Sequence, residues 1–148
     1  YSDIIYDYNK IQNLFYQKKI NHISIPVLIN WKKIWKKRLK NYIDDLESLK
    51  FDTNNNLLEI GKKIQNTNSL MGQYMGIIYV PKSMNNLILE SYDHKSWNKK
   101  HVTEFLNFFL SKKIKIKCIP YDGFWYEFDQ NSELERFKNN FSTQLKFY

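Results

Sequence analysis

Residues 114–129 read IKIKCIPYDGFWYEFD and contain two predicted strands joined by a tight turn. β-branched and aromatic residues on either side of Pro120–Gly123 favour extended backbone, and the sequence Pro-Tyr-Asp-Gly is typical of a turn. In the second strand Trp125, Glu127 and Asp129 alternate with two aromatic residues, so these three side chains face one side. The end of this strand therefore combines an aromatic ring with two carboxylates.

Strands and helices alternate in the rest of the chain. Apolar patterns typical of extended backbone predict strands at 2–6, 23–29, 48–51, 57–60 and 73–80. Apolar residues at helical spacing predict helices at 9–19, 31–39, 84–89, 98–110 and 133–141. This alternation is typical of an α/β fold with a mixed sheet flanked by helices. A chain of 148 residues buries one core, so we expect a single domain over residues 1–148.

A few residues predict where these elements end or are irregular. The turn-forming residues 52–56 join two strands into a hairpin, which we expect Gly61 to end. Pro26 lacks an N–H for a sheet ladder, so its strand is expected at an edge or with irregular pairing. The run 73–80 is rich in strand-forming residues and predicts a central strand. Ser132 is the expected N-cap of the last helix.

The composition limits the classes of protein without choosing a function. A formal net charge of +8 suits a nucleic acid, a nucleotide or a membrane surface as partner, although the general bias towards Lys, Asn and Ile weakens this indication. The single cysteine, Cys118, excludes an intramolecular disulfide and is expected to be a buried strand residue. No run approaches the roughly 20 apolar residues of a membrane span. With no signal peptide at the start, we expect a cytoplasmic protein that does not bind membranes.

Five short motifs, in order along nearly the whole chain, point to one protein family. They lie at residues 1–6, at 31–38 continuing into 45–47, at 59–63, at 72–76 and at 122–129. The last motif, W-x-E-x-D at the end of a strand and before a helix, is the most specific. Together they resemble the nucleotidyltransferases of the phosphocholine cytidylyltransferase type, which have relatives in capsule and cell-surface sugar modification. The resemblance implies the C-terminal portion of a Rossmann-like fold.

The resemblance also implies a metal centre. By position, Asp3 and Asp129 would hold Mg²⁺ at the reaction centre. Both reactants are anions, and a divalent cation held by carboxylates neutralises their charge and aligns the displacement. We expect the two aspartates to meet because both lie at the carboxyl ends of neighbouring strands, where open α/β sheets bind ligands.

The acceptor side is assigned from the resemblance and from side-chain chemistry. Glu127 beside Trp125 would hold a cationic group through charge and cation–π attraction, whereas a core tryptophan beside an exposed glutamate is the structural alternative. Arg38 and Lys62 would grip phosphate oxygens or, equally, be solvated surface charges. Weaker candidates are Trp35 and Thr103. The substrate-binding candidates are Trp31, Arg38, Lys62, Gln73, Tyr74, Trp125 and Glu127.

One part of the family pattern is absent from this sequence. The family's Gly-rich loop, which binds the triphosphate, has no counterpart, because the four glycines are too dispersed to cradle phosphates. The chain begins at Tyr1 with a strand following almost at once, so we expect that an N-terminal nucleotide-binding segment is missing and required for activity. Leu28 stands where relatives commonly carry an aspartate, which leaves the acceptor unidentified.

These observations predict transfer of a nucleotidyl group, with cytidylyl from CTP favoured, to a small phosphorylated substrate with release of pyrophosphate. A homodimer is one possible oligomeric state, which the sequence does not decide. One alternative is a non-catalytic remnant that binds a ligand or partner chain. A second alternative is nucleic-acid binding through the basic helix 31–40, whose signature would be a steep loss of affinity with added salt.

Overall fold

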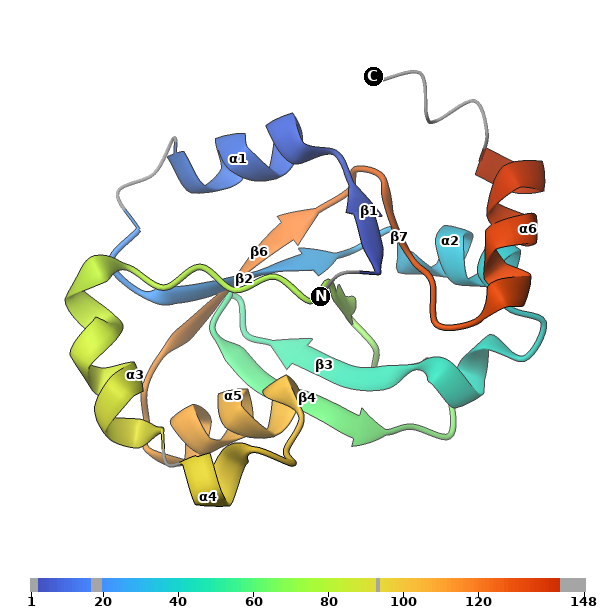
Figure 1. Ribbon diagram of the computed structural model, residues 1–148. Coiled ribbons are helices and arrows are strands. Elements are labelled where there is room, and N and C mark those ends of the chain that lie inside the picture. Colours follow the sequence, from blue (N-terminus) through green and yellow to red (C-terminus); the bar gives the residue numbers. More distant parts are fainter. Residues whose placement is uncertain (1–2, 17–19, 93, 142–148) are drawn as a thin grey trace.

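The computed structural model describes residues 3–16, 20–92 and 94–141 (Figure 1). Its strands are β1 (Ile4–Tyr6), β2 (Ile23–Leu28), β3 (Glu47–Phe51), β4 (Leu57–Lys63), β5 (Gln73–Tyr74), β6 (Ile116–Tyr121) and β7 (Trp125–Glu127). Its helices are α1 (Tyr8–Tyr16), α2 (Trp31–Arg38), α3 (Asn85–Ser91), α4 (His94–Trp97), α5 (Val102–Ser111) and α6 (Asn131–Phe141), with 3₁₀ turns η1 (Tyr42–Asp45) and η2 (Lys82–Met84).

The described strands form one three-stranded sheet and two two-stranded sheets. β2 lies between β5 and β6, antiparallel to β5 and parallel to β6. β1 pairs with β7, and β3 with β4, both antiparallel. Figure 1 shows α1 on one side of the central strands and α3, α4 and α5 on the other. The predicted mixed α/β class is confirmed, whereas its extension into a larger nucleotide-binding sheet stays a prediction. In the described part of the chain, no helix has the length and apolar composition to cross a membrane.

β2 is buried along its whole length, and Pro26 lies in its middle opposite Ile119 of β6. The expected edge position is therefore wrong, but the expected irregular pairing is confirmed. Towards β5, Ser24 and Tyr79 exchange hydrogen bonds of 2.9 and 2.8 Å. Pro26 lies two residues further on and would direct its missing N–H to the same side. The pairing of β2 with residues 73–80 is therefore interrupted at Pro26, and it is regular again where Val27 and Leu28 pair with β5.

The central strand predicted over residues 73–80 is wrong in its extent. β5 has only two residues, and Tyr79 returns as an isolated bridge to Ser24. Gly76 has a φ of +74°, a left-handed conformation that takes the chain out of the ladder. The local strand propensity is thus overridden by the backbone of Gly76 and by the absent donor of Pro26.

Several predicted boundaries also change. Gly61 does not end the hairpin, because β4 continues past it through a register irregularity in which Gly61 has a φ of +81°. Ser132 is not a cap but the second residue of α6, which begins at Asn131. The short helix α4 was not predicted.

Pro120 continues β6 instead of opening the predicted turn. The Cys118 N–H donates to the Asn55 carbonyl at 2.8 Å, away from β2. Since alternate residues of a strand point the same way, the missing donor of Pro120 also faces away from β2 and interrupts no bond with it. Cys118 itself is buried and free, as predicted.

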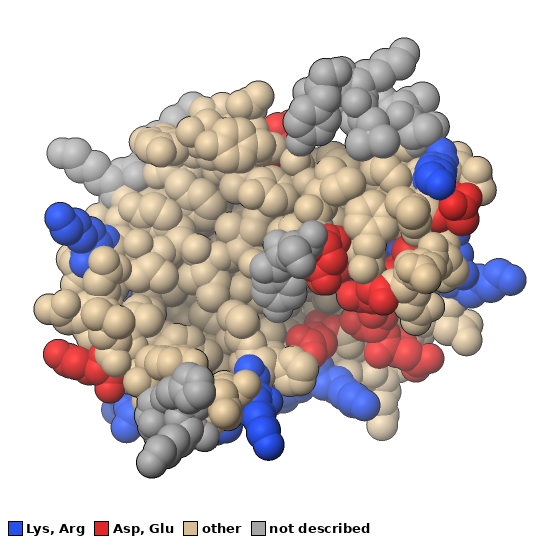
Figure 2. All heavy atoms as spheres, viewed as in Figure 1, with Lys and Arg blue, Asp and Glu red and all other residues tan. Residues whose placement is uncertain are grey.

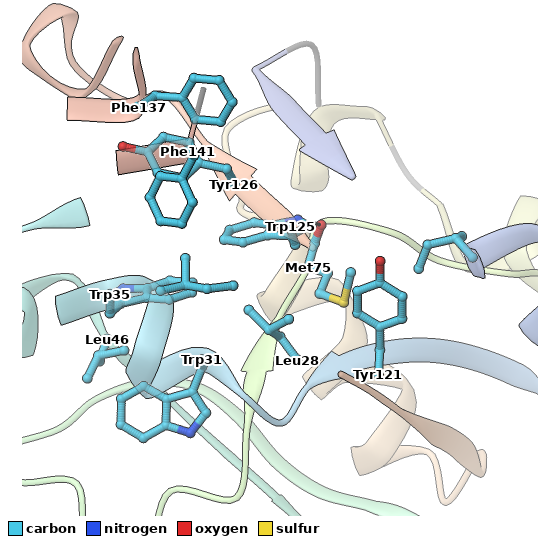
Figure 3. Close-up of a cluster of buried hydrophobic side chains, with 12 residues drawn as sticks. Leu28, Trp31, Trp35, Leu46, Met75, Tyr121, Trp125, Tyr126, Phe137 and Phe141 are labelled. Carbon is cyan, nitrogen blue, oxygen red and sulfur yellow. Dashed lines mark hydrogen bonds between the residues drawn. The ribbon is translucent and has the colours of Figure 1, made fainter. Parts of the chain in front are cut away.

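The described residues form two apolar cores. One joins β2, β4, β6 and α5. The other contains Trp35 and Trp125, which stack at 5.2 Å with their planes 4° apart, close to Met75 and Leu28 (Figure 3). This second core supports the site described below.

Replacing Gly61 by alanine tests the irregularity in β4. An added Cβ would lie 2.7 Å from the Cβ of Thr103, and a φ of +81° is unfavourable for any residue with a side chain. We expect the free energy of unfolding in urea to fall by about 1–3 kcal/mol. Leu58→Ala on the same strand, at a side chain 61% exposed, is the control and should change it by less than about 0.5 kcal/mol. Equal small effects would contradict the conformation assigned to Gly61.

Candidate functional site

Three carboxylates meet where β1 begins and β7 ends. Asp3 directly precedes β1, Glu127 ends β7, and Asp129 follows two residues later. Ile4 lies opposite Glu127, and the Phe128 N–H donates to the Asp3 carbonyl at 2.9 Å. One oxygen from each of the three carboxylates lies within 4.8 Å of the others.

The route by which Asp3 and Asp129 meet differs from the expectation. Asp3 lies at the amino end of its strand, not at the carboxyl end. The two residues come together because β1 and β7 are antiparallel, which places the start of one strand beside the end of the other. The structure thus brings together the two residues predicted as metal ligands and adds Glu127. That they hold a metal stays a prediction.

The electrostatics of this group favour a cation. Burial, followed by the charge of Asp129, raises the pKa of Glu127 to about 7, although Arg38 opposes the rise. Burial also raises the pKa of Asp129. The Oδ1 atom of Asp3 is buried and has no hydrogen-bond partner among the described residues. Carboxylate oxygens are the ligands that Mg²⁺ prefers, so the residues present fit such an ion.

Arg38 lies at the centre of the site and has no exposed side-chain surface. Its Nε donates to Glu133 Oε1 at 2.6 Å, and its Nη1 donates to Asp45 Oδ2 at 3.1 Å. Its Nη2 donates to Asp129, and Nη1 lies 3.6 Å from Glu127. Burial alone would lower the pKa of Arg38, but the four carboxylates outweigh it and raise the pKa. Arg38 is therefore not a solvated surface charge, and its phosphate binding, which this buried position does not support, stays a prediction.

Glu133 is a part of the site that the sequence reasoning missed. It is fully buried, and its Oε2 accepts the N–H groups of Asp129 and Gln130 at 2.7 and 2.8 Å. A glutamate at the third position of a helix commonly bonds back to the N–H groups before that helix. The position of Glu133 in the helix could have indicated this role. The prediction of Ser132 as the N-cap placed Glu133 at the first helical position instead of the third.

A cavity of about 150 Å³ opens beside the three carboxylates, and Glu127 belongs to both. Gln73 and Tyr74, two of the predicted substrate-binding residues, line it. The weaker candidates Trp35 and Thr103 line it as well. The Gln73 Nε2 donates to the Glu47 carbonyl at 2.9 Å, which fixes the amide at the cavity wall.

The cavity wall is acidic although the whole chain is basic. Asp45, Glu47 and Glu127 are among its lining residues, and the described lining contains no lysine or arginine. Figure 2 shows acidic side chains gathered on one part of the face viewed in Figure 1. Asp45 and Glu47 lie in the second family motif but are not among the predicted site residues.

Trp31, Trp125 and Lys62 do not line this cavity. Trp31 and Trp125 belong to the core, and the Trp125 Nε1 donates to the Met75 carbonyl at 3.0 Å (Figure 3). Trp125 therefore supports the cavity from behind, through its stack on Trp35. Lys62 is exposed and pairs with Glu59 at 2.7 Å. Direct substrate contact by these three residues has no support in the geometry.

The basic helix considered for nucleic acid is α2. Its buried side includes Arg38, so that residue is not available to a phosphate backbone. Its exposed lysines are Lys32, Lys33, Lys36 and Lys37. These form a solvated surface opposite the core, separate from the acidic cavity.

No family model matches the chain. The chain is 31% identical to the CTP:phosphoglutamine cytidylyltransferase of Campylobacter jejuni subsp. jejuni, over 144 aligned residues that cover 91% of this chain. It is similar to a cytidylyltransferase. The family resemblance drawn from the five motifs is thereby confirmed. The chain spans 56% of the length of this curated relative, so the similarity concerns part of that protein.

The raised pKa of Glu127 predicts a pH-dependent stability in metal-free buffer. A carboxyl group whose pKa rises on folding, here from 4.5 to about 7, stabilises the fold fully below pH 4.5, and this contribution is lost as the pH rises through about 7. Wild-type protein should therefore lose unfolding free energy relative to Glu127→Gln between pH 4.5 and pH 8. Urea unfolding with a chelator at both pH values measures this difference.

The control for this experiment is Glu135→Gln, which removes one carboxylate at a side chain 68% exposed on α6. Its stability relative to wild type should vary far less between the two pH values. If Glu127→Gln behaves like this control, the environment assigned to Glu127 is wrong.

Proposed function

We propose that the protein transfers a cytidylyl group from CTP to a small phosphorylated substrate and releases pyrophosphate. The observation that carries the proposal is the meeting of Asp3, Glu127 and Asp129 beside a cavity, in a chain similar to a cytidylyltransferase. A phosphate oxygen of the acceptor would attack the α-phosphorus of CTP. The bond from that phosphorus to the β-phosphate oxygen would break, and pyrophosphate would leave.

Asp3, Glu127 and Asp129 are the residues that would hold Mg²⁺. When bound, the ion would neutralise phosphate charge and so reduce the repulsion between two anionic reactants. The support within this chain is the close approach of three carboxylates and the buried, unsatisfied Oδ1 of Asp3. Among the described residues, Arg38 lies within ion-pair distance of Glu127 and Asp129 and balances part of this negative charge.

The cavity would orient the acceptor. Because Glu127 belongs to both the carboxylate group and the cavity, the acceptor phosphate would lie at that end and the rest of the molecule would extend along the wall. Gln73, Ser48 and Thr103 offer hydrogen bonds there, and Trp35 offers an aromatic face. Holding the acceptor in one orientation brings its phosphate oxygen into line for attack.

The acidic wall supports an acceptor that carries an amine. A wall lined by Asp45, Glu47 and Glu127 would repel an acceptor that is anionic throughout, whereas an ammonium group would be attracted by these residues and by nearby aromatic faces. The Campylobacter relative is named for phosphoglutamine, and glutamine carries an amine. We therefore place phosphorylated amines and amino acid derivatives first among acceptors, and a cytoplasmic role in surface-glycan decoration fits this class.

Pyrophosphate release tests the reaction. The protein, with any upstream segment restored, is incubated with Mg²⁺ and a panel of nucleoside triphosphates crossed with phosphorylated small molecules. We expect release with CTP and one amine-bearing acceptor. Silence across a broad panel with folded protein would contradict the transferase and favour a ligand-binding module.

The same assay tests the carboxylates. Asp3→Asn and Asp129→Asn should each lower turnover at least about 100-fold, beyond the 10–100-fold typical for residues outside the ligand shell. The matched control is Asp122→Asn, an exposed aspartate paired with Lys10, which should leave turnover unchanged. Wild-type turnover in both test variants would rule out the proposed metal ligands.

Glu47→Gln tests the acidic wall. Loss of this charge should raise the KM for an amine-bearing acceptor about tenfold, equivalent to about 1.4 kcal/mol, and leave the KM for CTP unchanged. Glu90→Gln, at an exposed position of α3, controls for the change in net charge. An equal rise in both KM values, or no rise for the acceptor, would show that the wall does not recognise a cation.

A further inference from the structure

Glu133 lies behind the site, on α6, and its carboxylate has no exposed surface. It does not line the cavity, and it is not one of the three carboxylates that approach one another at β1 and β7. Both of its oxygens are nevertheless occupied. Oε1 accepts from Arg38, and Oε2 accepts two backbone N–H groups, those of Asp129 and Gln130. A buried carboxylate is costly unless its oxygens are satisfied in this way.

The contacts of Glu133 fix Asp129 from two directions. The bond to the Asp129 N–H fixes the backbone of that residue. The bond to the Arg38 Nε fixes the guanidinium, whose Nη2 in turn donates to the Asp129 carboxylate. A side chain 45% exposed, as that of Asp129 is, would otherwise rotate in solvent.

The other end of the same guanidinium reaches the cavity wall. Arg38 Nη1 donates to Asp45 Oδ2, which also accepts the Trp35 Nε1–H at 2.8 Å. The guanidinium carbon lies 5.2 Å from the centre of the Trp35 ring. One rigid fork therefore connects the metal-binding end of the site to the acceptor-binding wall.

We propose that the Glu133–Arg38 pair is a positioning device that sets the orientation of Asp129 for a divalent cation and holds Asp45 and Trp35 in register with it. The inference rests on the proposed metal site. Glu133 touches neither cation nor substrate, so it is a positioning residue. Groups that orient metal ligands from outside commonly change metal affinity or activity 10–100-fold when replaced.

A purely structural role is the competing explanation. The Arg136 Nη1 donates to the Arg38 carbonyl at 2.8 Å, so α6 and α2 are also joined by a contact that does not involve the carboxylates. If Glu133 only joins these helices, its replacement lowers stability and leaves cation affinity unchanged well below the unfolding transition. Cation affinity therefore separates the two explanations.

The test measures Mn²⁺ affinity by titration calorimetry, together with kcat and KM, in Glu133→Gln. The variant keeps the shape of the side chain but loses the charge that orients Arg38. We expect Mn²⁺ affinity and kcat each to fall about 10–100-fold, with cooperative unfolding retained. Glu135→Gln, the same substitution two residues away at an exposed pair with Lys138, should change neither quantity.

Arg38→Lys provides a second variant that keeps the buried positive charge but lacks the planar fork. It decides the question if Glu133→Gln does not fold, and it should show the same loss of Mn²⁺ affinity. Unchanged Mn²⁺ affinity in a folded variant, with wild type binding the ion, would overturn this inference alone. Absence of Mn²⁺ binding by wild type would overturn the proposed metal site and this inference together.

Discussion

A buried guanidinium surrounded by carboxylates is the interaction on which the rest of the site depends. The Arg38 guanidinium lies beside four carboxylates. They belong to η1, to β7, to α6 and to the segment between β7 and α6. The dependence is mutual. Removing one partner of a buried ion pair typically costs about 3–5 kcal/mol, because the remaining charge has no compensation. Two stretches of the chain that are distant in sequence, residues 38–45 and 127–133, are therefore held together by these ion pairs.

The position of Arg38 follows from the helix that carries it. Trp35 and Arg38 are three residues apart on α2 and share a face, so the same surface presents an aromatic ring and a cation. Trp35 then packs between Trp125 behind it and the cavity in front. The apolar core and the charged network therefore share Trp35. A change in the packing of Trp125 would alter the position of Trp35 and so the cavity wall.

The sequence predicts much of the fold because its strongest patterns are local. The buried strand at 23–28 and the hairpin around residues 52–56 needed only periodicity and turn residues. The strand predicted at 73–80 is wrong in its extent because of Gly76 within the run and because of Pro26, which lies on a different strand. No local pattern contains that pairing. Tertiary context therefore decided what residue preferences could not.

The site, too, depends on contacts between residues far apart in the sequence, which local patterns do not predict. The metal candidates Asp3 and Asp129 came from family resemblance, since they lie 126 positions apart in the sequence and the pairing of β1 with β7 brings them together. Arg38 stands among lysines, and although its helical spacing from Trp35 places it on the apolar face of α2, no local pattern identifies the carboxylates that pair with it. Glu133 resembles any glutamate at the start of a helix. Charge that is buried by long-range contacts has the same local signature as charge in solvent.

Under the proposed function, the contrast between a basic chain and an acidic site would have a physical use. A net charge of +8 attracts anionic substrates from solution, while the carboxylates at the site would repel them. The repulsion by the site carboxylates would be relieved if a divalent cation and an ammonium group entered the acidic region together with the phosphates. The carboxylates then receive two cations, and each phosphate lies beside positive charge. Under the proposed function, an acceptor without an amine would bring no cation to the acidic wall, so the wall would favour acceptors that carry one.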